Sequence, residues 1–320
     1  MRFTGALALI GLSGLLGGCG GGGDLLLPGD SEPAAVRLIQ GGDQNGRVGE
    51  ALPQPLVAEV TDGTGRAVEG ATVVFVLTDA APGAVVEPDT AQTDSKGYAT
   101  ASVVLGTRPG SQAGLVQALG PSGTPVATDD FALNALPESA NGIGLVSGDG
   151  QSAPVGGTLP EPLVVQVADA FGNPIPDVVV NWTLEGGGSV SAEQTTTGAD
   201  GRTSVQRTLG STAGTQRTLA TVDGLAGSPV AFVHTALAGS ASGVTIVAGD
   251  DQTGPITTEL PQDLVVQVRD AAGNAVPGVA VTWVVGTGGG SVTPTTSNTD
   301  AQGQATAAWT LGAAPGPNTV

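Results

Sequence analysis

The 320-residue sequence contains one cysteine, Cys19, so no disulfide bond can form within the chain and its stability must come from packing. Aromatic residues make up 3% of the chain, and basic residues are few, with 10 Lys and Arg against 29 Asp and Glu. The formal net charge of −19 repels nucleic acid and anionic lipid, so we expect no nucleic-acid partner. We attribute the acidity to solubility rather than to a dedicated cation site.

Reactive side chains are too scarce for a catalytic site. His234, the one histidine, lies in the apolar stretch FVHTALA, where a half-exposed strand position is more plausible than a catalytic base. The glycine runs 186–188 and 288–290 lack the Lys-Ser/Thr of a phosphate-binding loop, which favours plain glycine-rich loops. We therefore expect a protein that is not an enzyme and needs no cofactor.

The first residues read as a targeting segment. Arg2 precedes an apolar run, Phe3 to Leu16, that is too short to span a bilayer. The Leu-Gly-Gly-Cys that ends at Cys19 resembles the lipobox of bacterial lipoproteins. This resemblance implies a signal peptide at 1–18, lipid attached to Cys19, a flexible Gly-rich tether at 19–33, and a place in the outer membrane or at the cell surface. The alternative is an ordinary secretory signal with an incidental cysteine.

The remaining sequence repeats one pattern three times. The second copy contains LPEPLVVQVADAFGNPIPDVVVNWTLEGGGSVS (159–191) and the third LPQDLVVQVRDAAGNAVPGVAVTWVVGTGGGSVT (260–293), whereas the first is the looser LPQPLVAEVTDGTGRAVEGATVVFVLTD (52–79). A spacing of about a hundred residues allows each copy a core of its own, so each copy is predicted to be a domain. The domains are repeat 1 (34–137), repeat 2 (138–239) and repeat 3 (240–320).

Apolar residues alternate within each copy, as in strands with one buried face. In repeat 2 Val180 and Trp182 point inward, while Val179 and Thr183 point outward. A second alternating strand has a site, occupied by Val103, Arg207 and Trp309, whose mixed chemistry predicts a place near a rim. The residues expected in the cores are Phe75, Trp182, Trp283, Leu105, Leu209 and Leu311.

Turn residues separate these strands. The chain holds 53 Gly and 22 Pro, and the Gly-Asn of DAFGNPIP (169–176) and DAAGNAVP (270–277) favours tight turns. A second turn carries Gly97, Gly201 and Gly303 in the three copies. Short strands at regular spacing, with no helical segment, predict an all-β chain of tandem immunoglobulin-like β-sandwiches.

The pattern D-x-x-G-N-x-x-P-x-x-x-V-x-W, followed by GGGSV and T-D-x-x-G, resembles the bacterial Ig-like domains of group 1, the Big-1 repeats of invasin and intimin. Repeat 1 departs from it, because Arg66 replaces the turn Asn and Phe75 replaces Trp. The resemblance implies a non-catalytic adhesin or stalk at the cell surface. The membrane barrel and lectin-like domain of invasin and intimin have no counterpart here, so any host-cell or extracellular ligand is unidentified.

The third copy stops before its pattern is finished. Aligning Gly110, Gly214 and Gly316 places Val320 opposite Thr218, beyond which repeat 2 continues to Ala238. We therefore expect repeat 3 to lack most of its last two strands, to expose core surface and to be unstable alone. We also expect the sequence to be a fragment of a longer array.

Two further questions stay open at this level. Asp149, Asp250 and Asp251 lie near the expected junctions and could bind calcium, although solvated carboxylates are favoured because the dense spacing of a calcium loop is missing. The alternative functions are the stalk of a secreted enzyme or a carbohydrate-binding or cell-wall-binding protein, with the active module beyond residue 320. Exposed aromatic residues would support carbohydrate binding, and only Tyr98 and Trp309 are candidates.

Overall fold

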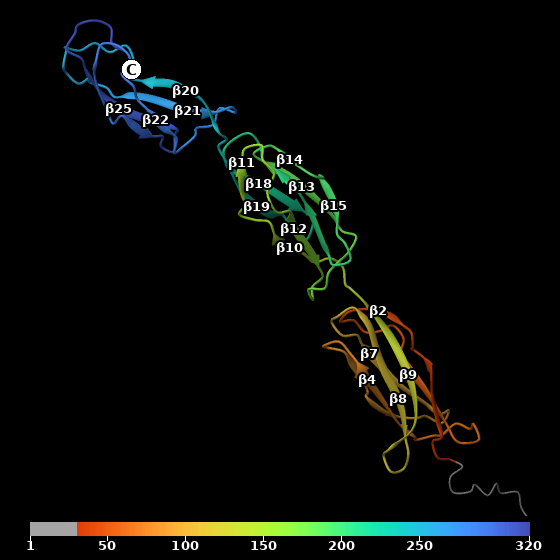
Figure 1. Cartoon of the computed structure of the whole chain (residues 1–320). Helices are drawn as coiled ribbons and strands as arrows, with labels where there is room; N and C mark the ends of the chain where they lie inside the picture. Colours follow the sequence, from red (N-terminus) through yellow and green to blue (C-terminus); the bar gives the residue numbers. More distant parts are fainter. Residues whose placement is uncertain (1–30) are drawn as a thin grey trace, which may run out of the picture. The chain divides into compact units, whose positions relative to one another are not determined.

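A computed structural model describes residues 31–320, which form 25 β-strands and no helix (Figure 1). The predicted all-β, Ig-like architecture is confirmed. The described chain divides into two compact units: most of repeat 1 makes the first, and repeats 2 and 3 make the second together with the short segments Arg47–Glu50 and Gly106–Gly110. Cys19 and the predicted signal peptide and tether up to residue 30 lie outside the described residues.

Repeat 1 has two sheets with a core that includes Phe75 and Leu105 between them. The first sheet runs in the order β1 (Ala35–Gln40), β3 (Leu56–Thr61), β7 (Tyr98–Val104), β5 (Val85–Glu87). The second runs in the order β2 (Asn45–Arg47), β9 (Pro125–Leu136), β8 (Gly110–Leu119), β4 (Thr72–Asp79), β6 (Thr90–Gln92).

Repeat 2 repeats this plan. One sheet runs β10 (Gly142–Ser147), β12 (Leu163–Ala168), β16 (Arg202–Val205), and the other runs β11 (Ser152–Pro154), β19 (Val230–Leu237), β18 (Gly214–Thr221), β13 (Val179–Glu185), β15 (Gln194–Thr196). A small pair, β14 (Ser189–Val190) and β17 (Arg207–Thr208), closes one end.

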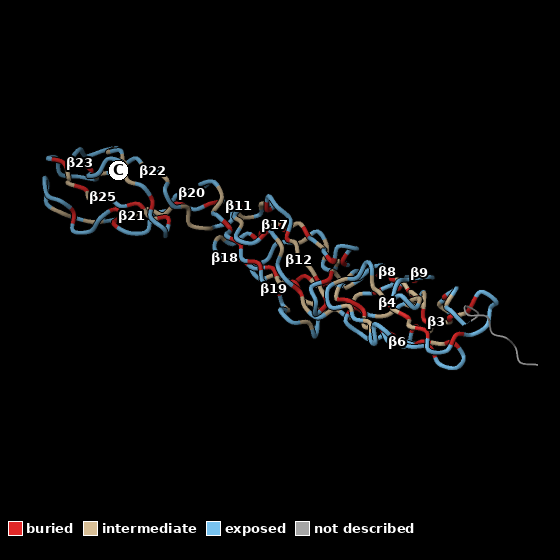
Figure 2. Tube along the Cα trace, turned by 90° about the horizontal axis from the view of Figure 1, so that it is seen from below, coloured by how far each residue is buried: buried red, intermediate tan, exposed pale blue. Residues whose placement is uncertain are grey.

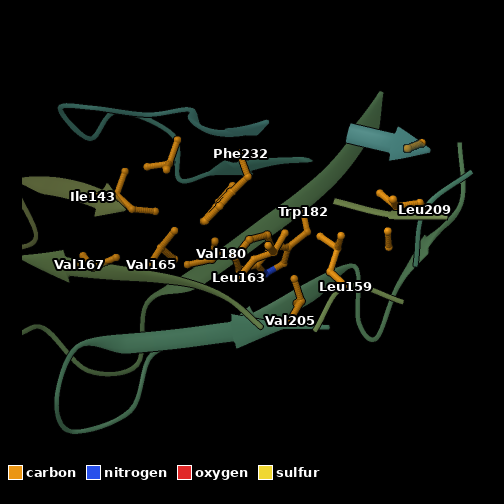
Figure 3. Close-up of a cluster of buried hydrophobic side chains, with 14 residues drawn as sticks. Ile143, Leu159, Leu163, Val165, Val167, Val180, Trp182, Val205, Leu209 and Phe232 are labelled. Carbon is orange, nitrogen blue, oxygen red and sulfur yellow. The ribbon is translucent and has the colours of Figure 1, made fainter. Parts of the chain in front are cut away.

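The core of repeat 2 is centred on Trp182 of β13 (Figure 3). Its ring lies with its centroid 6.0 Å from that of Phe232 on β19, in a tilted arrangement. Leu163 and Val205 from the opposite sheet belong to the same buried cluster. The indole Nε1 donates to the Thr195 hydroxyl at 2.8 Å, so the polar end of the ring is satisfied as well.

Repeat 3 has a complete first sheet and a reduced second one. The first runs β20 (Ala241–Ala248), β21 (Leu264–Asp270), β25 (Gln304–Leu311), β23 (Gly290–Thr293), whereas the second contains only β22 (Ala280–Thr282) and β24 (Thr296–Asn298). Residues 240–320 thus form no counterpart of β11, β18 and β19.

The reduced sheet leaves the inner face of repeat 3 partly open. Val244 of β20 is 62% exposed, although its counterpart Ile143 in repeat 2 is 6% exposed. Trp283 and Leu311, which the sequence places in the core, are only half-buried. The physical reason is that no side chain takes the place that Phe232 fills in repeat 2. Figure 2 shows buried residues distributed along the strands of the repeats, with β20 exposed throughout.

A glycine after the first strand recurs for a steric reason. Strand β10 contains a bulge between Leu145 and Ser147, and Gly148 follows it with a φ of 97°. A Cβ atom at Gly148 would lie 2.4 Å from the carbonyl oxygen of Pro162, so no other residue fits there without moving backbone. Gly41 and Gly249 repeat this conformation and this close approach.

The two tryptophans provide a matched test of this packing. We expect Trp182→Ala to lower the free energy of unfolding of repeat 2 by about 3–5 kcal/mol, because it removes a fully enclosed ring. Trp283→Ala should cost repeat 3 less than half of that, since its ring is half-buried. Urea denaturation followed by circular dichroism measures both losses, with Trp182→Phe as a ring-retaining control. Equal losses at the two sites would show that repeat 3 encloses its tryptophan as well as repeat 2 does.

Candidate functional site

The acidic residues predicted as possible calcium ligands are exposed and do not converge. Asp149 accepts a hydrogen bond from the Val233 amide at 2.7 Å, and Asp250 accepts one from the Asp251 amide at 3.0 Å. No group of three or more His, Cys, Asp or Glu residues in the 31–320 range could hold a metal ion. The same range contains no helix that is long and apolar enough to cross a membrane. These hydrogen bonds link Asp149 to strand β19 and Asp250 to its own loop.

The most unusual feature of repeat 2 is a buried polar cluster around Arg207, whose side chain is 0% exposed. Its Nη2 donates to the Gly187 carbonyl at 2.6 Å and to Gln216 Oε1 at 3.2 Å. Its Nη1 donates to the carbonyls of Ser189, at 3.3 Å, and Thr208. Burial lowers the pKa of this guanidinium, whose hydrogen-bond partners in the described part of the chain are carbonyl oxygens and no carboxylate.

The glycine-rich loop at 186–188 lies against this arginine. A Cβ atom at Gly188 would lie 2.5 Å from Arg207 Nη1 and 2.2 Å from the Thr208 carbonyl oxygen. Gly210 faces the same loop, and a Cβ atom there would lie 2.1 Å from the Gly186 carbonyl oxygen. The glycines are therefore needed for the close approach of two backbone segments, an approach that recurs at Gly290 and Gly312 in repeat 3, and this gives the run a structural role.

His234 of β19 lies in the same polar region. It is 0% exposed, its Nε2 is 3.2 Å from the Thr218 hydroxyl, and its Nδ1 has no hydrogen-bond partner in the described chain. Burial lowers the pKa of the imidazole, and the charge of Arg207 lowers it further, whereas Asp149 opposes the shift. A histidine with no exposed surface cannot reach a substrate, so the geometry gives it no catalytic use.

Two predictions about these positions are wrong. His234 is fully buried rather than half-exposed, because β19 faces the core at every second residue. Val103, Arg207 and Trp309 are all buried rather than near a rim. Alignment with repeat 1 could have indicated that both sites are buried, because the residues aligned with Arg207 and His234 are the apolar Val103 and Leu133. Of the two aromatics considered for an exposed platform, Trp309 is buried and Tyr98 is half-buried.

The Gly-Asn turns are organised by a carboxylate. In repeat 3, Asp270 Oδ1 accepts from the amides of Ala272 at 2.9 Å and Asn274 at 2.8 Å, while Oδ2 accepts from Asn274 Nδ2 at 2.9 Å. The side-chain hydrogen bond from Asn274 is the main cause that lowers the pKa of Asp270 to about 2. Asp169 and Asn173 make the same contacts in repeat 2, where burial opposes the shift but the hydrogen bonds outweigh it and lower the pKa of Asp169.

The open face of repeat 3 forms a cavity of about 640 Å³. Trp283 Nε1 donates to the Ser297 hydroxyl at 2.9 Å, whereas Trp309 Nε1 has no hydrogen-bond partner in residues 31–320. The cavity lies where β18 and β19 cover the core of repeat 2, so it is the uncovered interior of the sandwich. Its apolar lining includes Ile246, Leu260, Leu264, Trp283, Trp309 and Leu311.

The repeats were compared with known protein families. A family model described as a bacterial Ig-like domain (group 1) matches residues 146–235 and 259–315, which lie in repeats 2 and 3. No curated protein matches the chain.

Several solved structures are similar in fold. FdeC, an adhesin of Escherichia coli, has 22% sequence identity and a TM-score of 0.50, with 89% of this chain and 91% of FdeC covered. InvD of Yersinia pseudotuberculosis has 15% identity and a TM-score of 0.43, covering 90% of this chain and 84% of InvD. Invasin, a bacterial integrin-binding protein, has 17% identity and a TM-score of 0.40, covering 87% of this chain and 54% of invasin.

The buried imidazole predicts a pH dependence of stability. The pKa of His234 is lower in the folded repeat than the value of about 6.5 in an unfolded chain, so the unfolded state binds the proton first. Stability present above about pH 6.5 is therefore lost as the pH falls, by up to about 1.4 kcal/mol per pH unit. Urea midpoints of repeat 2 between pH 7.5 and 5.5 measure this loss. His234→Leu, which copies Leu133 of repeat 1, should flatten the dependence, and an unchanged slope in that variant would contradict the assignment.

Proposed function

A bacterial Ig-like domain (group 1) model matches residues 146–235 and 259–315, and we propose that the chain is an array of such domains, acting as a surface-anchored adhesin or structural stalk that catalyses no reaction. The observation that carries the proposal is the direct succession of sandwiches. Strand β19 ends repeat 2 at Leu237, and β20 begins repeat 3 at Ala241, so the linker is too short to act as a flexible spacer. An array of this kind suits a protein that holds a binding surface away from a membrane.

The anchor in this proposal is the lipid on Cys19. The lipobox-like Leu-Gly-Gly-Cys ending at Cys19 and the four glycines that follow it support attachment of the array to a membrane through a tether. Acyl chains contribute about 0.8 kcal/mol per buried methylene, so more than one chain makes attachment stable. Outer membrane or cell surface is the location we propose.

The partner in this proposal is an extracellular or host-cell ligand that binds exposed loops of the repeats. The description of FdeC as an adhesin supports an adhesive role for tandem sandwiches of this fold. The polar cluster of repeat 2 is enclosed, so loops rather than the interior are the contact surfaces we propose. Loops of such sandwiches cluster at the ends of the strands, where residues vary without disturbing the core.

The alternatives are the stalk of a secreted enzyme and a carbohydrate-binding or cell-wall-binding protein. Carbohydrate recognition by an aromatic platform is weakened as an alternative, because Trp309 is buried and Tyr98 is half-buried. No specific contact favours an enzyme stalk over an adhesin stalk.

Surface display tests the proposal. Intact cells of a bacterium with two membranes, expressing the full chain, should expose the repeats to added protease and to an antibody against repeat 2. Cys19→Ser should move most of the protein from the membrane fraction to the soluble fraction, because it removes the atom that carries the lipid. Repeats that stay shielded on intact cells would rule out a surface protein.

Attachment separates the adhesin from the stalk. Cells that display the parent chain should bind epithelial cells or matrix-coated surfaces more than cells with empty vector do. Purified C19S protein should compete for this attachment. Full display without any gain in attachment would rule out the adhesin and leave the stalk.

A further inference from the structure

The carboxamide of Asn274, in repeat 3, forms hydrogen bonds with the backbone of repeat 2. Its Nδ2 donates to the Ser211 carbonyl at 2.9 Å, and its Oδ1 accepts from the Ala213 amide at 2.9 Å. Both partners lie in the loop between β17 and β18. Repeats 2 and 3 belong to the same compact unit. A side chain that donates and accepts at once fixes both the distance and the orientation of the loop that it contacts.

Asp270 adds a third bond at the same junction. Its Oδ2 accepts from the amide of Gly239, in the linker between the repeats, at 2.8 Å. The same oxygen accepts from Asn274 Nδ2, which holds the carboxamide in position. One carboxylate thus secures the linker and aims the residue that reaches repeat 2.

The arrangement recurs at the start of repeat 2. Asn173 Nδ2 donates to the Thr107 carbonyl at 2.9 Å, and Asp169 Oδ2 accepts from the Glu138 amide at 3.2 Å. Thr107 lies in the segment Gly106–Gly110, which groups with the second compact unit. Alignment of the repeats makes Thr107 the counterpart of Ser211, and Glu138 the counterpart of Gly239. The same backbone atoms are therefore used in both places.

The three repeats differ at the residues that form these junction contacts. Pro109 is the counterpart of Ala213 and has no amide hydrogen, so the bond that the Ala213 amide donates to Asn274 has no equivalent at residue 109. In repeat 1, Asp62 still accepts from the Thr64 and Arg66 amides, at 2.8 and 3.0 Å. Repeat 1 follows no other repeat in this sequence, and it has Arg66 where the others have Asn. The aspartate at this site therefore stabilises the turn in all three repeats, whereas the asparagine contacts the preceding loop in repeats 2 and 3.

From these contacts we infer that Asn274 is a junction residue that holds repeat 3 in a defined orientation on the loop of repeat 2 that precedes it, and that Asn173 binds the equivalent loop segment, Gly106–Gly110, through the same side-chain nitrogen. The inference builds on the proposed stalk, because it names the side chains that stiffen the array. Bending at the junction between repeats 2 and 3 would break both bonds of Asn274 together. Neighbouring domains move relative to one another by default unless contacts of this kind restrain them.

Pulsed electron paramagnetic resonance tests the inference. The full chain carries Cys19→Ser, so that labels attach only at Thr235→Cys in repeat 2 and Thr306→Cys in repeat 3, both of which are exposed positions. Asn274→Ala should roughly double the width of the distance distribution, because an unrestrained junction samples many orientations. Asn173→Ala, the same substitution at the other junction, should leave this width unchanged. A distribution as narrow in Asn274→Ala as in the parent would overturn the inference.

Hydrogen exchange gives a second, local readout. The Ala213 amide donates to Asn274 Oδ1, so its exchange should accelerate about fivefold or more in Asn274→Ala, as expected for the loss of one hydrogen bond. The amides of β21 should keep their protection, which would show that repeat 3 is still folded. Unchanged exchange at Ala213 would count against the inference. Both measurements use purified protein without a ligand, so their outcome is independent of whether the chain is an adhesin.

Discussion

The packing of one large ring between two sheets is the contact on which each repeat depends. In repeat 2 the indole of Trp182 is enclosed by Phe232 from its own sheet and by Leu163 and Val205 from the opposite one. Burying such a ring dominates the energy of a small sandwich that has no disulfide bond. Repeat 3 shows the converse, because the missing strands leave Trp283 half-buried and Val244 exposed.

Much of this architecture could be predicted from alternation alone. A period of two assigns Val180 and Trp182 to one face of β13 and Val179 and Thr183 to the other, and the structure has them there. Alternation says nothing of how a polar residue at an inward position is satisfied. The mixed chemistry of the site therefore led to the wrong placement of Arg207, because its partners are backbone carbonyls that no residue type identifies.

The junction shows a second limit of sequence reasoning. The spacing of Asp270 and Asn274 indicates a turn, and the turn is present. The Asn274 carboxamide, however, contacts Ala213 and Ser211, at sequence separations of 61 and 63. Local patterns cannot disclose partners at that distance. Comparison between copies offers the available clue, because Asn is present in the two repeats that follow another repeat and absent from repeat 1.

The enclosed polar groups of repeat 2 also make its strands poor substitutes for those of repeat 1. Tandem domains of one family can misfold when neighbours exchange equivalent strands. A strand β19 inserted into repeat 1 would place the His234 imidazole at the buried position of Leu133. The imidazole would then lack the Thr218 hydroxyl to which it is hydrogen-bonded in repeat 2. A polar group buried without its partner is costly, so such an exchange is disfavoured. The polar core therefore favours the assembly of repeat 2 from its own strands during folding.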